Sequence, residues 1–378
     1  MAGIYIHIPF CAKKCRYCDF VSFAGIKDTS AYTAALISEM RIFAPLVKGR
    51  HFETVYIGGG TPTVMPQGII SRILSEAGKL FDISGDAEIS IECNPESVTE
   101  EKLSEYRSAG INRLSIGLQS ADNEVLKAVG RIHTAERFLE AYNTAEKCGF
   151  TNINADIMHG LPKQTLSSYL DTIGFLGKLR PTHISSYSLI LEEGTPLYND
   201  IAEGREEAPD SDLAADMEDA GFDALAALGY ERYEISNFAK PGFECRHNLN
   251  YWNNGEYLGL GLNSHSAMRI NNKWMRWANK SDLSDYIIDA ANGRLPVAET
   301  KEIPREEEMF ENVMLELRKT AGLDRKAFEA RFGIDPVTNY ASAVSEAILE
   351  GNMVCDENTV KLTKKGLDFQ NEVLLKFM

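Results

Sequence analysis

The chain has 378 residues and a formal net charge of −16, from 39 basic and 55 acidic side chains. This balance argues against general nucleic-acid binding and against electrostatic docking on anionic lipid, because both rely on Lys and Arg. The length allows two or three domains, one of which can be a large α/β barrel.

The sequence contains seven cysteines and no apolar run long enough to span a membrane. We recognise no secretory signal, so we expect a cytoplasmic protein whose thiols stay reduced and free for metal binding. A transmembrane segment is not expected. Peripheral membrane contact and homodimerisation stay open at this stage.

Three cysteines, Cys11, Cys15 and Cys18, follow the first predicted strand at intervals of four and three residues. A [4Fe–4S] cluster normally takes one thiolate for each iron, so three cysteines leave one iron with an open coordination position. S-adenosylmethionine (SAM) is the molecule known to bind such an iron, through its amino and carboxylate groups, and it serves radical chemistry. The spacing therefore predicts a SAM-ligated [4Fe–4S] cluster.

Two other uses of these cysteines fit less well. A structural zinc site usually has a second pair of ligands downstream, and the sequence has no such pair. A disulfide framework is typical of small secreted domains. The cysteines Cys93, Cys148 and Cys355 lack metal-binding spacing, and we interpret them as ordinary thiols.

The first 190 residues alternate β-rich runs with amphipathic stretches such as Thr165–Leu179, the pattern of a parallel α/β fold. The predicted strands are Ile4–Ile8, Thr54–Ile57, Glu88–Glu92, Arg113–Ile116, Asn152–Ile157 and His183–Leu189. Six such units predict a partial (β/α)6 TIM-like barrel, in which the chemistry belongs on the loops after the strands.

The polar motifs of this half follow the predicted strands. The cysteine loop follows the first strand and Gly58–Gly60 the second, while Glu92, Gln119 and Asp156 lie at the ends of the next three. A carboxylate at such a position can hold ribose hydroxyls, and Arg131 can pair with a carboxylate. Each residue taken singly is more often a solvated rim residue, so it is their shared edge that indicates one site.

The glycines Gly58–Gly60 have two interpretations. They can leave a backbone edge free for the amino and carboxylate groups of a ligand, or they can form a tight turn before the next helix. A dinucleotide site is excluded, because no Gly-x-Gly-x-x-Gly follows a strand and opens a helix. The neighbouring cysteine loop favours ligand binding.

The alternation stops near residue 240. We assign residues 1–237 to the barrel with the cluster and SAM site, 238–303 to a connector of irregular structure with short strands, and 304–378 to a C-terminal domain. Helical periodicity from Pro304, and in Ala327–Phe332 and Val344–Leu349, precedes a short hairpin, as in a winged-helix unit. The negative charge argues against DNA binding by this unit.

A family resemblance is carried by Tyr5–Phe20, Gly59–Pro62, Gln119, Leu126–His133 and Asp156–Thr165. These motifs resemble the HemN-like branch of the radical SAM superfamily, and the resemblance covers nearly the whole chain. It implies that the three cysteines of the loop hold the cluster, and it names no catalytic residue. It also implies that the SAM region is lined by Tyr5, Tyr17, Gly59, Gly60, Thr61, Glu92, Gln119, Arg131 and Asp156.

Two subgroups of that branch differ at Phe20 and in the connector. Oxygen-independent coproporphyrinogen III oxidases carry a further cysteine at the position of Phe20. They also carry an extension before the first strand, whereas the first strand of this chain is predicted from residue 4. The segment His247-Asn-Leu-Asn-Tyr-Trp252 instead matches the His-Asn-x-x-Tyr-Trp motif of the HemW family of haem chaperones. The resemblance therefore implies haem handling rather than porphyrin oxidation.

His247 is the candidate axial ligand of haem iron, because neutral imidazole is a common haem ligand. Tyr251 and Trp252 offer flat apolar faces for the macrocycle. The alternative is that His247 and Trp252 pack the connector against the barrel. Cys245 is a weaker candidate ligand, and a buried inert thiol explains it better.

The resemblance leads us to expect a haem chaperone that carries a SAM-ligated [4Fe–4S] cluster. Its partners would be haem and acceptor haemoproteins, such as those of the respiratory chain. The alternative is a radical SAM enzyme, either a coproporphyrinogen III oxidase or a methyltransferase-like relative. The cluster and SAM residues are common to both functions and leave the question of catalysis open. One departure from the family pattern lies in the segment Gly259–Ser266, because Leu262 and Asn263 stand where smaller residues are expected and would narrow any pocket that this loop lines.

Overall fold

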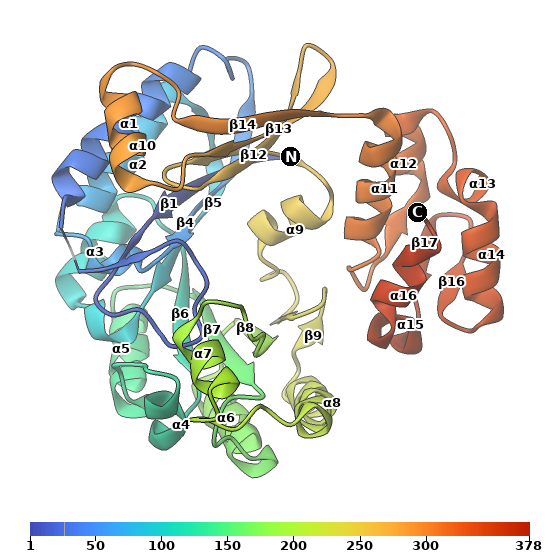
Figure 1. Ribbon diagram of the computed structural model, residues 1–378, viewed down its shortest axis with the longest axis horizontal. Helices are drawn as coiled ribbons and strands as arrows, with labels where there is room; N and C mark the ends of the chain where they lie inside the picture. The colour runs from blue at the N-terminus through green and yellow to red at the C-terminus, as the bar shows by residue number, and fades with distance from the viewer. Residues whose placement is uncertain (26) are drawn as a thin grey trace.

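A computed structural model of the protein describes residues 1–25 and 27–378. Its centre is a twelve-stranded sheet in which six parallel strands lie side by side in chain order (Figure 1). They are β1 (Ala2–Ile8), β4 (His51–Gly59), β5 (Asp82–Cys93), β6 (Arg113–Gln119), β7 (Asn152–His159) and β8 (His183–Ser188). The predicted α/β fold with a partial (β/α)6 barrel is confirmed.

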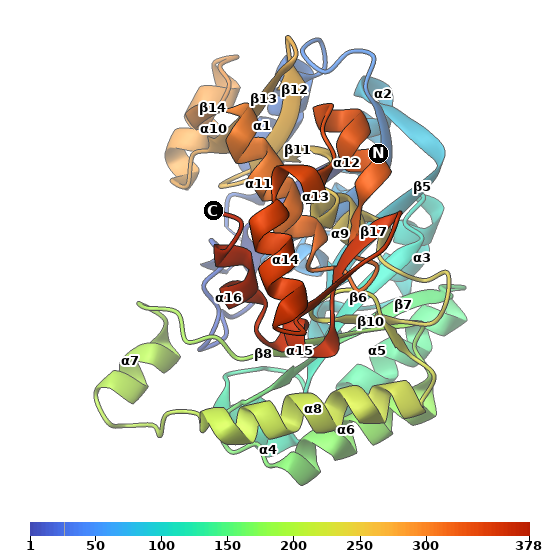
Figure 2. The same ribbon diagram turned by 90° about the vertical axis from the view of Figure 1, so that its right-hand side faces the viewer.

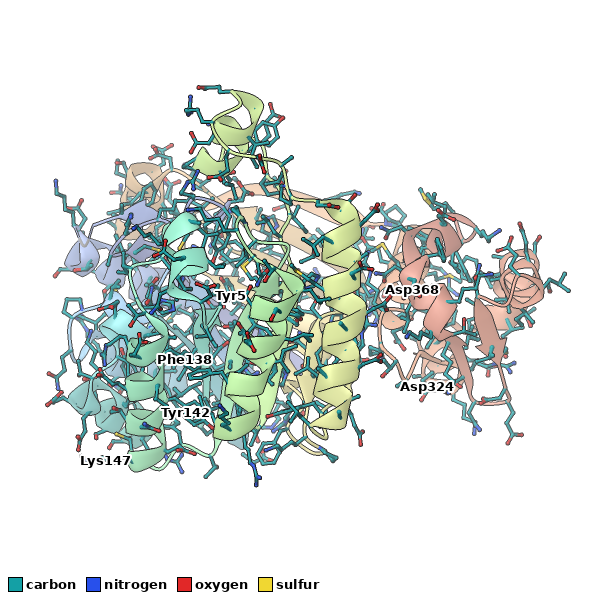
Figure 3. The ribbon with its side chains drawn as sticks, turned by 90° about the horizontal axis from the view of Figure 1, so that it is seen from below. Tyr5, Phe138, Tyr142, Lys147, Asp324 and Asp368 are labelled. Carbon is teal, nitrogen blue, oxygen red and sulfur yellow. The ribbon has the colours of Figure 1, made fainter. Side chains whose placement is uncertain are left out.

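Helices cover the outer face of the parallel strands (Figure 1). They are α1 (Thr29–Phe43), α2 (Ile69–Leu80), α3 (Glu100–Ser108), α5 (Ala135–Lys147) and α6 (Leu166–Leu179). Apolar side chains at helical spacing fix their inner faces. In α5, Phe138 and Tyr142 are buried, whereas Lys147 pairs with Glu100 at the surface (Nζ to Oε2, 2.7 Å); Figure 3 labels these three residues of the helix. Thr165 begins α6 by accepting a hydrogen bond from the N–H of Ser168.

Further strands extend this same sheet on both sides, most of them from the connector. Strand β11 (Glu256–Leu260) runs parallel to β1, and β12 (His265–Ile270), β13 (Lys273–Asn279) and β14 (Val297–Ile303) continue it antiparallel. At the other edge β10 (Asn237–Ala239) pairs with β8, and β9 (Glu231–Arg232) pairs with β10. The connector is therefore more regular than the sequence suggested, and the predicted division at residue 237 stays a prediction.

The remaining elements of the barrel and connector lie around this sheet. Strands β2 (Phe10–Cys11) and β3 (Phe23–Ala24) pair next to the cysteines, and the turns η1 (Pro62–Val64) and η2 (Pro95–Ser97) follow β4 and β5. Helices α4 (Asn123–Ala128) and α7 (Pro196–Ala202) lie in loops after strands, α8 (Ser211–Ala227) packs on α6, and α10 (Leu283–Ala291) packs on α1 (Figure 2). Helix α9 (Arg246–Trp252) lies between the sheet and the C-terminal unit (Figure 1).

The C-terminal unit has a hydrophobic core of its own, formed by residues such as Val313, Phe328, Val344 and Leu362. Its helices are α11 (Arg305–Glu316), α12 (Arg325–Phe332), α13 (Pro336–Asn339), α14 (Ala341–Leu349), α15 (Lys364–Asp368) and α16 (Gln370–Leu375). The strands β15 (Leu323–Asp324), β16 (Met353–Cys355) and β17 (Thr359–Leu362) form a small antiparallel sheet. Helices followed by this hairpin match the winged-helix pattern. No helix of the described chain is both long and apolar enough to cross a bilayer.

Candidate functional site

A cavity of about 350 Å³ lies at the carboxyl ends of the parallel strands. All three cysteines of the motif line it. Eight of the nine residues predicted for the SAM region line it with them: Tyr17, Gly59, Gly60, Thr61, Glu92, Gln119, Arg131 and Asp156. Cys11 and Asp156, which are 145 positions apart in the sequence, thus line the same cavity. This is expected for the loop end of a parallel barrel.

Hydrogen-bond donors reach two of the three sulfurs. The Thr61 hydroxyl donates to Sγ of Cys11 at 3.5 Å, and Nη1 of Arg131 donates to Sγ of Cys15 at 3.6 Å. Burial raises the pKa of the Cys18 thiol, so metal binding there would have to displace a proton. Donors aimed at sulfur stabilise thiolates and tune a bound cluster.

The three sulfurs do not converge on one point. Within residues 1–25 and 27–378, no three His, Cys, Asp or Glu side chains are grouped closely enough to hold a single metal ion. In a [4Fe–4S] cluster each thiolate binds a different iron, so the ligands need only surround a shared space. Three cysteines around one cavity fit that requirement.

The cysteine loop is anchored by Arg16, a residue that sequence reasoning missed. Its Nη2 donates to Asp200 at 2.8 Å and to Glu206 at 3.1 Å, and its carbonyl accepts a hydrogen bond from the N–H of Leu197 at 2.9 Å. These partners lie in and after α7, more than 180 positions away in the chain. No local signal in the sequence indicates such a contact.

The glycine turn has a packing role that the sequence left open. Gly59 has φ +111°, which favours glycine, and a Cβ on it would lie 2.4 Å from the His7 ring. A Cβ on Gly60 would lie 2.8 Å from the carbonyl oxygen of Phe10 and 2.9 Å from that of Ile8. The N–H of Gly60 donates to Ile8 at 2.8 Å. The turn therefore packs directly on the cysteine loop while its other side lines the cavity.

Glu92 and Asp156 place two carboxylates in the cavity wall. Glu92 accepts hydrogen bonds from the Tyr56 hydroxyl and the Gly59 N–H, both at 3.0 Å. Burial, and then the charge of Asp156, raises the pKa of Glu92 to about 7, and burial raises the pKa of Asp156. Neighbouring buried carboxylates favour a ligand that brings hydroxyl donors or positive charge.

Gln119 is strained and incompletely paired. It ends β6 with φ +62°, in the left-handed region that most residues avoid. Its side-chain Oε1 is buried and accepts no hydrogen bond within the described chain. A buried acceptor without a donor, at a strained position in a cavity, is typical of a ligand-binding residue.

Further residues of the cavity wall were missed, among them Tyr56, Ser115 and Tyr187. Tyr56 lies two residues before Gly58 on β4, and Ser115 two residues before Gly117 on β6. Because side chains alternate along a strand, counting back by two from the rim motifs would have found both. Tyr187 lies on the sixth strand, for which the sequence offered no rim motif.

Tyr5 and His247 lie outside this cavity. The Tyr5 hydroxyl is hydrogen-bonded to Nδ1 of His7 at 3.0 Å, and Tyr5 lines a second cavity beside β11. His247, on α9, is 1% exposed. Its Nδ1 is hydrogen-bonded to Thr54 at 2.8 Å and its Nε2 to the Tyr251 hydroxyl at 3.0 Å.

The environment of His247 bears on its predicted role as a haem ligand. Burial, and then the charge of Arg113, lowers the pKa of His247 to about 3, so the ring is neutral. Both ring nitrogens already have partners, however, and iron ligation would require Tyr251 to release Nε2. The role stays a prediction. Cys245 is completely buried, and its Sγ donates to Glu88 at 3.5 Å.

Comparison with known proteins agrees with this architecture. The family model of the radical SAM superfamily matches residues 5–176, and that of the HemN C-terminal domain matches residues 303–369. Among solved structures, the chain is similar to coproporphyrinogen III oxidase (HemN) from Escherichia coli, described as a radical SAM enzyme. The TM-score is 0.85 and the identity 26%, covering 100% of this chain and 89% of the other.

The fold and the cysteine-lined cavity define a protein of the radical SAM class, which implies a [4Fe–4S] cluster and SAM. Among curated proteins, the chain is 35% identical to haem chaperone HemW of Bacillus subtilis, covering 100% of this chain and 99% of the relative. It is 32% identical to haem chaperone HemW of Escherichia coli, covering 100% and 98%. The chain belongs to the HemW family.

Proposed function

We propose that this protein binds haem and transfers it to acceptor haemoproteins while it carries a SAM-ligated [4Fe–4S] cluster. The observation that carries the proposal is the full-length relation, at 32–35% identity, to proteins named haem chaperone HemW. The relation to coproporphyrinogen III oxidase is weaker, at 26% identity. Phe20 supports the same choice, because the resemblance places a cysteine at this position in that enzyme.

In this proposal Cys11, Cys15 and Cys18 hold the cluster, and its open iron binds the amino and carboxylate groups of SAM. The remaining groups of the cavity would orient SAM. Glu92 and Asp156 would accept hydrogen bonds from ribose hydroxyls, and Gln119 Oε1 would gain the donor that it lacks. Arg131, which donates to Sγ of Cys15, would offer positive charge to the SAM carboxylate.

The haem partner, its acceptors and the quaternary structure belong to the same proposal. We infer that the acceptors are apoproteins that need haem, such as those of the respiratory chain. We also infer that the protein acts in the cytoplasm. Peripheral contact with the membrane would bring it to such acceptors, and homodimerisation is part of the same proposal. His247 is proposed as a haem ligand that becomes available once Tyr251 moves away.

The test is a pair of assays on the anaerobically purified protein with its cluster in place. Hemin is titrated and followed by absorbance, and coproporphyrinogen III is supplied with SAM and a reductant while products are analysed. We expect stoichiometric hemin binding, haem transfer to an added apo-haemoprotein, and no decarboxylation. Efficient formation of protoporphyrinogen, without hemin binding, would contradict the proposal.

A further inference from the structure

A second cavity, of about 610 Å³, lies beside the cluster site. Its wall is formed by β1, by the end of the cysteine loop, by the segment from α9 to β13, and by Leu315 of α11. Phe20, which is 65% exposed, lines both this cavity and the cysteine cavity. The two spaces therefore meet at the position that separates the two subgroups of the family branch.

The walls of this second cavity suit a flat, largely apolar molecule. Four aromatic side chains line it, Tyr5, Phe20, Tyr251 and Tyr257. Aromatic faces pack well against a macrocycle, and the volume lies in the usual range of about 300 to 1,000 Å³ for cofactor and ligand pockets. Arg276 also lines the cavity, but both of its terminal nitrogens pair with Glu311, so it does not by itself select an anion.

The histidines of the chain identify the group in this cavity that can reach a metal. The sequence contains seven, and five of them are buried. The two exposed histidines are His51 and His265. His51 pairs with Asp82 at 3.0 Å, at the end of β4 that is remote from the cysteines, and His265 lines the second cavity. Within the described chain, neither ring nitrogen of His265 forms a hydrogen bond with a side chain or backbone group.

The other two histidines near this cavity are occupied. His7 lines the cavity, but Nδ1 is hydrogen-bonded to Tyr5 and Nε2 to the carbonyl oxygen of Val21, each at 3.0 Å. His247 is screened from it by Tyr251, whose ring contacts His247 edge-on with centroids 4.8 Å apart and whose hydroxyl holds Nε2. Among the described residues, a metal entering the cavity therefore meets a free imidazole only at His265.

We propose that haem binds in this second cavity and that His265 is its accessible axial ligand. The inference rests on the proposed function and assigns the first iron contact, made before Tyr251 releases His247, to a residue outside the His247–Trp252 motif. Haem iron takes neutral imidazole as an axial ligand, and an unpaired ring nitrogen at a cavity wall is ready to coordinate without breaking an existing hydrogen bond. Tyr251 then forms part of the wall against which the macrocycle packs.

The experiment compares hemin binding by the full-length protein with binding by His265→Ala and by His51→Ala. The second variant is a matched control, because it removes the other exposed histidine at a site far from the cavity. Titrations followed by the Soret band give the affinity, and the band position with electron paramagnetic resonance reports the axial ligand. Free imidazole is added to His265→Ala as a rescue.

We expect His265→Ala to weaken hemin binding about tenfold or more, as loss of a metal-site interaction does, and to change the spectrum. Imidazole should restore the spectrum, and His51→Ala should behave as the wild-type protein. Wild-type affinity and spectrum in His265→Ala would overturn the inference, and so would weaker binding that keeps the wild-type spectrum. Failure of the wild-type protein to bind hemin would instead contradict the proposed function.

Discussion

Two positions on strand β5 use the same residue type for opposite purposes: Glu88, in the middle of the strand, and Glu92, near its cysteine end. Glu88 and Glu92 are four residues apart, so their side chains point to the same face of the sheet. Glu88 accepts hydrogen bonds from the N–H groups of Arg246 and His247, both at 3.1 Å, at the start of α9. Its carboxylate stabilises the amino end of that helix, where unpaired N–H groups and the helix dipole favour negative charge.

Glu92, at the cysteine end, has no such helix to hold. It lies next to another carboxylate, Asp156, and to the unpaired oxygen of Gln119. At the α9 end both nitrogens of His247 and both of His183 have partners, whereas Nε of Arg113, Oδ1 of Asn250 and Nε1 of Trp252 have none within the described chain. Buried polar groups alone therefore do not mark a ligand site, and what distinguishes the cysteine end is a cavity lined by two carboxylates and by the Gln119 oxygen, which accepts no hydrogen bond within the described chain.

The largest expected effect is at the cysteine end. In Cys15→Ser the reconstituted protein should fall from about four irons per chain to below about one, because the cluster loses one of three thiolates in a short loop. Iron and sulfide analysis measures this. Cys93→Ala is the control, since Cys93 lines the same cavity without belonging to the motif. Full iron retention in Cys15→Ser would remove Cys15 from the ligand set.

The second prediction sets the two glutamates of β5 against each other. Glu88→Ala should lower the free energy of unfolding by about 3 kcal/mol, because two buried N–H groups lose a charged acceptor. Glu92→Gln should change the free energy of unfolding by less than about 1 kcal/mol, since the substitution removes a buried negative charge that the neighbouring carboxylate of Asp156 repels. Urea unfolding of the two variants gives both values.

Ligand binding should rank these two variants in the reverse order. Glu92→Gln should weaken SAM binding to the cluster-loaded protein by about tenfold, the effect of one charge-assisted hydrogen bond. A variant of Glu88 that still folds, such as Glu88→Gln, should bind SAM as the wild-type protein does. If both variants lost SAM binding equally, the two ends would not be separate in function.

The third prediction concerns the turn that packs on the cysteine loop. Gly60→Ala should cost about 2 kcal/mol, because the new methyl group meets two backbone carbonyl oxygens that cannot move without shifting the loop. It should also slow cluster loading. Gly78→Ala, in α2, is the matched control: no heavy atom lies within 4 Å of its Cβ, and it should stabilise by about 0.5 to 1 kcal/mol. Thermal unfolding and iron uptake measure both variants.

The cysteine end was predictable from sequence because its signals are local. Each rim motif directly follows a strand, and parallel topology alone brings strand ends together, so the sequence by itself sufficed to group Glu92, Gln119 and Asp156. The other end depends on contacts between distant segments. The burial of His247 follows from Thr54 and Glu88, about 190 and 160 positions earlier, and no local pattern reports such pairing.

The sheet extension was missed for the same physical reason. Strand β11 lies parallel to β1 although about 250 residues separate them. The glycines at 259 and 261 allow backbones to approach closely, but in the sequence such glycines look like loop signals. A Cβ on Gly259 would lie 2.0 Å from the carbonyl oxygen of His265. The segment therefore resembled irregular structure, although its glycines serve tight packing of strands.

The smallest predicted effect tests whether a raised pKa alone marks a ligand site. Burial raises the pKa of Glu39, on α1, to about 7, as it does for Glu92, yet Glu39 is held by Tyr286, by Asn279 and by the N–H of Gly261 at 2.8 Å. The native state then keeps a proton that the unfolded state has lost above about pH 4.5, so stability falls as the pH rises towards 8. Between pH 6 and 8 the loss should be about 1 kcal/mol.

In Glu39→Gln this contribution should disappear and only that of Glu92, whose pKa is also raised to about 7, should stay, while hemin and SAM binding keep wild-type levels because Glu39 lines neither cavity. Unfolding curves at pH 6 and 8 for both proteins measure the difference. A variant that kept the full pH dependence would show that another group is responsible. A variant that lost SAM binding would mean that the carboxylates of the two regions are coupled, and that pairing within the chain does not separate structural from ligand-binding residues.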